Sequence, residues 1–133
     1  MAPRGMNKVM IIGSLEREPE LRYTPGGRPV TSFSVATTHN WVTAEGIHNE
    51  ETEWFNVVAW GELAKVCHSR LHRDTRVYIE GRLKTRSWED GGGKRHFRTE
   101  IVARDMIVLA GDSVQESPAD HPGSDTFDNE YDF

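Results

Sequence analysis

The chain has 133 residues, a mass of 15.1 kDa and a formal net charge of −5, and this length favours one domain with a hydrophobic core over two. Its single cysteine excludes an internal disulfide and is typical of a reducing compartment. No apolar run reaches the roughly 18 to 20 residues of a membrane span, and residues 1–8 lack the apolar segment of a secretion signal. We therefore expect a soluble cytoplasmic protein without a membrane partner.

The negative charge is concentrated at the C-terminal end. Residues 112–133 hold seven of the 21 acidic residues and no lysine or arginine, so the remaining 14 acids face all 16 bases and residues 1–111 carry about +2. Ser, Pro, Asp and Gly dominate residues 112–133, and a segment of this composition buries too little apolar surface to fold. We therefore expect a folded domain over residues 1–111 and a disordered acidic tail over residues 112–133.

Three strands are predicted in the first half of the chain. Residues 7–15 form an apolar, β-branched run, and residues 19–29 are predicted as turns because they contain three prolines and two glycines. Residues 30–41 and 52–60 alternate between two kinds of side chain, as half-buried strands do. The polar segment 42–51 between them is predicted as a long hairpin loop.

The periodicity becomes helical between residues 61 and 73. Five residues at helical spacing form a mostly apolar stripe: Leu63, Val66, Cys67, Arg70 and Leu71. Cys67 on this stripe is expected to be a small buried hydrophobic residue. Two further strands are predicted over residues 76–89 and 96–109, joined by a turn of three glycines.

The predicted order is three strands, one short helix and two strands. Three interior glycines, Gly13, Gly61 and Gly81, can relieve crowding where a small barrel coils. Five coiled strands with a helix between the third and fourth are the arrangement of the OB-fold. We therefore predict an all-β fold class, a five-stranded OB-fold barrel with that one short helix.

The run from residue 77 to residue 88 carries the clearest functional pattern. Side chains alternate between the two faces of a strand. One face suits a core and consists of Val77, Ile79, Gly81 and Leu83. The other places three cations between two aromatic rings and consists of Tyr78, Glu80, Arg82, Lys84, Arg86 and Trp88. Rings stack on unpaired bases while cations follow a phosphate backbone, so this face predicts binding of single-stranded nucleic acid.

Each feature also has a simpler interpretation. A single tryptophan is more often a core residue than a binding residue, and Trp41, at a strand end, could cap the barrel. The row of Arg82, Lys84 and Arg86 could be a solvated face that prevents edge pairing. Arginine flanked by rings favours stacking and phosphate contact over this alternative.

Several phrases of the sequence follow one another in a familiar order: RGMNKVMIIGSL, PELRYTPGG, TEWFNVVAWGELA and VYIEGRLKTRSW. Over about residues 4–109 the chain resembles the bacterial single-stranded DNA-binding protein (SSB) family. The resemblance implies an OB-fold that assembles as a homotetramer and wraps single-stranded DNA. It also implies an acidic tail, ending in Phe, that recruits replication and repair proteins.

The resemblance also implies roles for individual residues. Base-stacking rings are implied at Trp41, Trp54, Trp88 and, where the family usually has Phe, at Trp60. Phosphate-contacting or groove-lining cations are implied at Arg4, Lys8, Arg73, Lys84 and Arg86, and the strand pattern adds Arg82. Subunit contacts are implied at Phe55 and Tyr78.

The chain departs from the family pattern in two places. Glu62 stands where many members have lysine, so one backbone contact is expected to be missing. The tail is short, and its tip keeps the acids and the terminal Phe but lacks the family's proline. These departures leave open which partners the tail binds and whether the chain is a specialised paralogue. We still expect the tip to dock on partners through Asp128, Glu130, Tyr131, Asp132 and Phe133. The alternative is a tail that serves only solubility.

The expected function is sequence-independent binding and protection of single-stranded DNA, in association with the nucleoid. No enzyme activity, cofactor or metal is expected. An OB-fold RNA or tRNA binder shares the same stacking chemistry, and a scaffold acting through Phe133 would bind no nucleic acid. A metal-dependent hydrolase could use His68 and His72, four apart on the predicted helix, but no acid, base and nucleophile accompany them.

Overall fold

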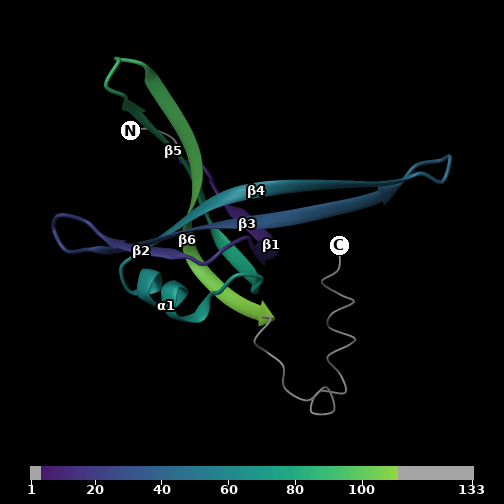
Figure 1. Ribbon diagram of the computed structural model, residues 1–133, viewed down its shortest axis with the longest axis horizontal. Helices are drawn as coiled ribbons and strands as arrows, with labels where there is room; N and C mark the ends of the chain where they lie inside the picture. The colour runs from purple at the N-terminus through teal and green to yellow at the C-terminus, as the bar shows by residue number, and fades with distance from the viewer. Residues whose placement is uncertain (1–3, 111–133) are drawn as a thin grey trace, which may run out of the picture.

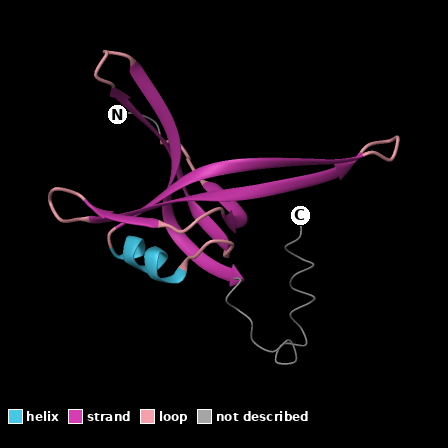
Figure 2. Ribbon diagram, in the orientation of Figure 1, coloured by secondary structure: helices cyan, strands magenta, loops and turns pink. Residues whose placement is uncertain are grey.

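The computed structural model describes residues 4–110. The elements follow in the order β1 (Val9–Leu15), β2 (Glu20–Tyr23), β3 (Pro29–Val42), β4 (His48–Trp60), α1 (Glu62–Arg70), β5 (Arg76–Glu89) and β6 (Arg95–Ala110). Figure 2 shows α1 as the one helix of this part of the chain. The predicted tail, 112–133, and its docking tip, 128–133, lie outside the described residues and stay predictions.

Five of the strands close into a barrel. The sheet order is β1-β5-β6-β4-β3, and β1 pairs again with β3 through Ser14 opposite Ala36 and Leu15 opposite Val35. Closure removes the unpaired edges that an open sheet exposes. The helix α1 connects β4 to β5, the third and fourth barrel strands along the chain. The predicted all-β fold, an OB-fold barrel with one short helix, is confirmed.

The short strand β2 was not predicted from the sequence. Its four residues pair antiparallel with β3 and add a sixth strand beside the barrel. Pro25, Gly26 and Gly27 lie in the turn of this hairpin, and Gly27 has a φ of 87°. The prediction of turns is therefore wrong for residues 20–23, because four residues are too few to show an alternating pattern.

The core fills the barrel and is closed on one side by α1. Buried barrel residues include Leu15, Phe33, Val35, Val57, Val77, Ile79 and Ile101. The helix adds Ala64 and Cys67, and burial raises the pKa of the Cys67 thiol to about 11. The predicted apolar stripe is partly wrong, because Val66 is exposed and the helix ends at Arg70.

Two of the three interior glycines are needed where strands come close. A Cβ at Gly13 would collide with the carbonyl oxygen of Ala36, and one at Gly81 with the carbonyl oxygen of Val102. Gly61 differs, because a Cβ there would meet nothing. Its φ of 68° lies in the left-handed region that favours glycine, and this residue immediately precedes α1.

Two long two-stranded ribbons extend beyond the barrel (Figure 1), formed by β3 with β4 and by β5 with β6. The β3–β4 pairing is unbroken to Val42 opposite His48, so the predicted loop 42–51 shrinks to a turn over residues 43–47. Alternation is weak there because both faces of this ribbon meet solvent. Leu83, predicted in the core, is 44% exposed for the same reason, since β5 has left the barrel at that point.

The helix α1 has nine residues, and within residues 4–110 no helix is long and apolar enough to cross a membrane.

Candidate nucleic-acid interface

A groove of about 690 Å³ runs across β3, β4, β5 and β6, with Arg17, Glu18, Pro19, Glu20 and Arg22 as a further wall. Its strand residues include Ser32, Ser34, Asn56, Val58, Trp60, Lys84, Arg86, Arg98, Glu100 and Val102. They alternate along their strands with core residues such as Val35, Ala59 and Ile101. The groove therefore lies on the strand faces that point away from the core.

The β5–β6 ribbon supplies three of the cations of this groove, Lys84, Arg86 and Arg98. The register places Lys84 opposite Glu100, Arg86 opposite Arg98 and Trp88 opposite His96. Opposite residues in a sheet share a face and lie within side-chain reach. The Arg86 Nη2 atom is 3.5 Å from Oε2 of Glu100, which is buried, so one acid is built into the basic face.

Trp88 is held between two basic neighbours. Its ring stacks on His96 at a centroid distance of 5.5 Å and an interplanar angle of 21°, and Cζ of Arg86 is 5.5 Å from the ring centroid. His96 Nε2 is 2.7 Å from Oδ2 of Asp90, whose other oxygen accepts N–H groups of the turn residues Gly92 and Lys94. The His96 contact is the main cause of the lowered pKa of Asp90. The turn thus orients His96, and His96 orients the ring.

Trp54 and Trp60 project from one face of β4, as the alternation predicts. Trp60 is half-buried, lines the groove and carries Cζ of Arg28 at 4.8 Å from its ring centroid. Trp54 is 56% exposed, and its indole Nε1–H donates a hydrogen bond of 2.9 Å to Oε2 of Glu16.

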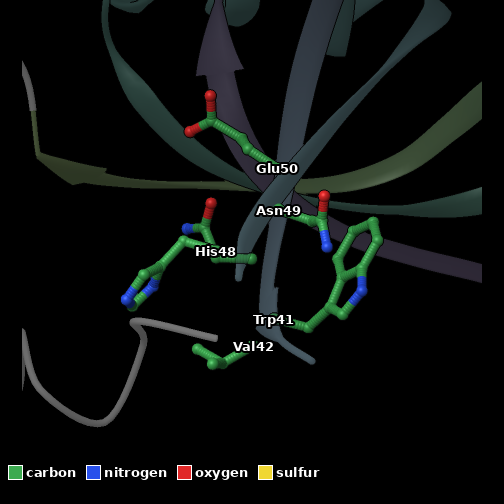
Figure 3. A pocket seen from close by; sticks show the side chains of 6 residues that line it. Trp41, Val42, His48, Asn49 and Glu50 are labelled. Carbon is green, nitrogen blue, oxygen red and sulfur yellow. The ribbon is translucent and has the colours of Figure 1, made fainter. Parts of the chain in front are cut away.

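Trp41 lies on the other face of the β3–β4 ribbon. The pairing from Val35 to Val42 contains no bulge, so Trp41 shares the face of Val35, whereas Trp54 is on the opposite face. Its ring is 42% exposed and stacks on His39 at 5.5 Å. Figure 3 shows the indole beside Asn49, its partner on β4, in a shallow pocket of about 330 Å³. The structure therefore separates Trp41 from the other three rings.

The six predicted cations fall into two groups. Lys84 and Arg86 line the groove, whereas Arg4, Lys8, Arg73 and Arg82 do not. Lys8 Nζ is 3.5 Å from Oε2 of Glu80, and Arg82 is exposed opposite Val102.

Arg73 contributes to the groove wall through its backbone. Its N–H donates to Oε2 of Glu18, a wall residue, at 2.9 Å. This hydrogen bond is the main cause of the lowered pKa of Glu18. The Arg73 side chain itself is exposed.

Sequence reasoning missed three groove cations, Arg17, Arg22 and Arg98. Arg98 had a usable signal, because pairing the two predicted strands across the glycine turn sets it opposite Arg86. Arg17 and Arg22 had none, since they lie in the stretch where β2 was not recognised.

The outer face of β1, β5 and β6 carries a second group of predicted residues. Tyr78 lies in a row between Ile12 and Ile107, and its hydroxyl donates to Oε1 of Glu80 at 2.9 Å. This hydrogen bond is the main cause of the raised pKa of Tyr78 and of the lowered pKa of Glu80. Phe55 is half-buried and packs against the core of its own barrel.

The two histidines of the hydrolase alternative do not share a helix. His68 is on α1, but His72 follows its end, and its Nδ1 is 3.3 Å from Oε1 of Glu18. Over residues 4–110 no three His, Cys, Asp or Glu side chains are grouped so that they could hold a metal ion.

The chain is similar in sequence to known proteins. The model of the single-strand binding protein family matches residues 6–109. "Single-stranded DNA-binding protein 1" of Chlorobaculum tepidum is 48% identical over 107 residues, which are 80% of this chain and 66% of that protein. The chain thus spans slightly less than two thirds of this relative's length.

Two solved structures are also similar. The SSB of Plasmodium falciparum, solved in complex with ssDNA, has a TM-score of 0.74 and 30% identity, covering 82% of this chain and 99% of that one. A deletion mutant of the single-stranded DNA binding protein from Thermus aquaticus has a TM-score of 0.71 and 30% identity, covering 83% and 53%. With the family model matching nearly the whole described domain, this chain belongs to the single-strand binding protein family.

Proposed function

We propose that this chain binds single-stranded DNA without sequence preference and protects it during replication, recombination and repair. The observation that carries the proposal is the groove in which Trp60, Lys84 and Arg86 lie together, with Trp88 exposed next along β5. Every base has a π-face, so ring stacking gives affinity without sequence choice. Duplex DNA hides these faces, and a preference for single strands follows. The proposed binding requires no chemical reaction.

Stacking and charge contribute in different ways. Base stacking on an aromatic side chain is worth about 1 to 3 kcal/mol per base. Each neutralised phosphate steepens the fall of log affinity with log salt by about 0.7 for a single strand. The proposed binding therefore has a stacking part that resists salt and a cationic part that salt weakens.

The proposal is tested by replacing Trp54 and Trp88 singly with alanine and titrating with oligo-dT. Each variant is expected to lose about 1 to 3 kcal/mol of binding free energy and part of the fluorescence quenching. Phe97→Ala is the matched control, because Phe97 is 69% exposed on the opposite face of the ribbon that carries Trp88. Unchanged affinity and quenching in both tryptophan variants would count against base stacking on these two rings.

Competition between oligo-dT and oligo-U of equal length separates DNA binding from RNA binding. We expect oligo-dT to bind at least as tightly as oligo-U. A strong preference for oligo-U would favour the RNA-binding alternative, and no binding of either would favour a scaffold.

We also propose that the chain assembles as a homotetramer. Support comes from the outer face of β1, β5 and β6, where Ile12, Tyr78 and Ile107 form a row and Met10 lies two residues before Ile12 on the same face. Met10 is 61% exposed and Ile107 50% exposed. An apolar row of this kind suits contact with a second copy of the chain. Phe55 contributes to the same assembly in this proposal.

The tail is proposed to recruit replication and repair proteins at the nucleoid through the ring and free carboxylate of Phe133 beside Asp132. A basic, apolar pocket on a partner would accept both. Deleting residues 112–133 should abolish capture of such partners and tighten DNA binding at low salt, because seven acids no longer compete for the groove. If neither capture nor affinity changes, the tail serves only solubility.

A further inference from the structure

The four tryptophans differ in what covers their rings. Trp41 stacks on His39, Trp60 faces Arg28, and Trp88 contacts both His96 and Arg86. Within residues 4–110, Trp54 makes no ring-stacking or cation–π contact. It is also the most exposed of the three exposed rings, at 56%. In this described part of the chain, the one hydrogen bond of its indole goes to Glu16.

The backbone of Glu16 is fixed to the barrel. Glu16 follows Leu15, the buried end of β1, and its N–H donates to the carbonyl of Ser34 on β3 at 3.2 Å. Trp54 is anchored to the same strand, since it pairs with Ala36. The carboxylate and the indole therefore meet from two segments that β3 holds in place, 38 residues apart in the chain.

The hydrogen bond uses the edge of the indole and leaves its faces open. The Nε1–H lies in the ring plane, so an acceptor at 2.9 Å occupies no stacking surface. Holding a side chain in its bound conformation lowers the entropy lost on binding. We propose that Glu16 is a positioning residue that presents Trp54 to an incoming base with both faces free. This inference rests on the proposed binding of single-stranded DNA.

Glu16 has two opposing effects on that binding. Its hydrogen bond orients the ring, whereas its negative charge repels phosphate. Glu16→Gln and Glu16→Ala remove the same charge, but only glutamine keeps an oxygen that can accept the indole N–H. The ratio of their affinities therefore isolates the hydrogen bond.

The test measures oligo-dT affinity of both variants at one salt concentration. E16Q is expected to bind about threefold to tenfold more tightly than E16A, the range of one net hydrogen bond. In a Trp54→Phe background the ratio should fall to about one, because phenylalanine has no N–H. The pair E89Q and E89A is the matched control, with an expected ratio of about one, since Glu89 is an exposed acid on the face of the β5–β6 ribbon that points away from the groove.

A second measurement uses the free protein. The ¹⁵N–¹H resonance of the Trp54 indole, assigned by its loss in Trp54→Phe, should shift in E16A and stay close to its wild-type position in E16Q. Equal affinities of E16Q and E16A, or a ratio that persists with phenylalanine at position 54, would overturn the positioning role. Failure of the wild-type chain to bind oligo-dT would instead overturn the proposed function. An unshifted indole resonance in E16A would contradict the hydrogen bond itself.

Discussion

Glu100 limits how strongly the cations of the groove can act. It is buried at 7% exposure in the groove wall, with Arg86 Nη2 at 3.5 Å from its carboxylate. A buried carboxylate is retained only when a partner compensates its charge. Arg86 is therefore shared between this internal partner and any phosphate that enters. The same acid lies opposite Lys84 on the ribbon.

Glu100→Gln should strengthen the cationic part of DNA binding. Without the carboxylate, Arg86 is free to neutralise a phosphate, so the slope of log affinity against log salt should steepen by about 0.7. Oligo-dT titrations at several salt concentrations measure this slope. Glu89→Gln is the control, because that exposed acid pairs with Arg95 on the opposite face of the same ribbon. An unchanged slope in Glu100→Gln would show that Glu100 does not withhold Arg86 from phosphate.

At the scale of elements, the path of β5 and β6 depends on one close approach. The register shifts between Glu80 and Gly81, where the backbone of β6 comes against the missing side chain of Gly81. After the next two pairs, in which Val102 and Ile101 of β6 still pair with β4, the two strands leave the barrel as the ribbon that carries Lys84, Arg86 and Trp88. The position of the proposed binding residues therefore depends on a glycine that does not line the groove.

Gly81→Ala should destabilise the barrel, because the new methyl group collides with the Val102 carbonyl. We expect a loss of about 1 to 3 kcal/mol in the free energy of unfolding, measured by urea denaturation. Gly91→Ala serves as the control, since a Cβ at Gly91 meets no atom within 4 Å. Equal free energies of unfolding for the two variants would mean that β5 and β6 can move apart at position 81 and accept the methyl group without loss of stability.

At the scale of the whole molecule, the two sides of the barrel have different chemistry. The groove is lined by a tryptophan and several arginines. The outer face of β1, β5 and β6 instead carries exposed apolar side chains, Met10 and Ile107, around Tyr78. This arrangement is compatible with the proposed assembly through the apolar face and the proposed DNA binding through the groove. The long ribbons in Figure 1 extend beyond the barrel.

Ile107→Glu should break the proposed assembly, because a carboxylate in an apolar contact loses its hydration without a partner. Light scattering is expected to report a smaller mass for this variant than for the wild-type chain. Ile47→Glu is the control, since Ile47 is 57% exposed in the turn of the β3–β4 ribbon. An unchanged mass for Ile107→Glu would place the subunit contact on another face.

The alternation of apolar and polar residues along the chain was enough to predict the barrel strands and part of the candidate site. It predicted the common face of Trp54 and Trp60 and the core positions Val77 and Ile79, which the structure buries. These predictions succeed because a strand with one buried face must repeat every second residue. The same rule failed at Leu83, where the strand continues but the core does not.

The amino-acid sequence by itself determined the barrel strands, the helix between them and the presence of aromatic and basic side chains on β5, because local periodicity records which face of each element is buried. Only the tertiary structure decided that Trp41 lies on the face opposite Trp54, that Glu16 reaches Trp54, and that Glu100 is built into the groove beside Arg86. These arrangements depend on strand register and barrel closure, which bring together residues far apart in the chain and leave no periodic signal in it.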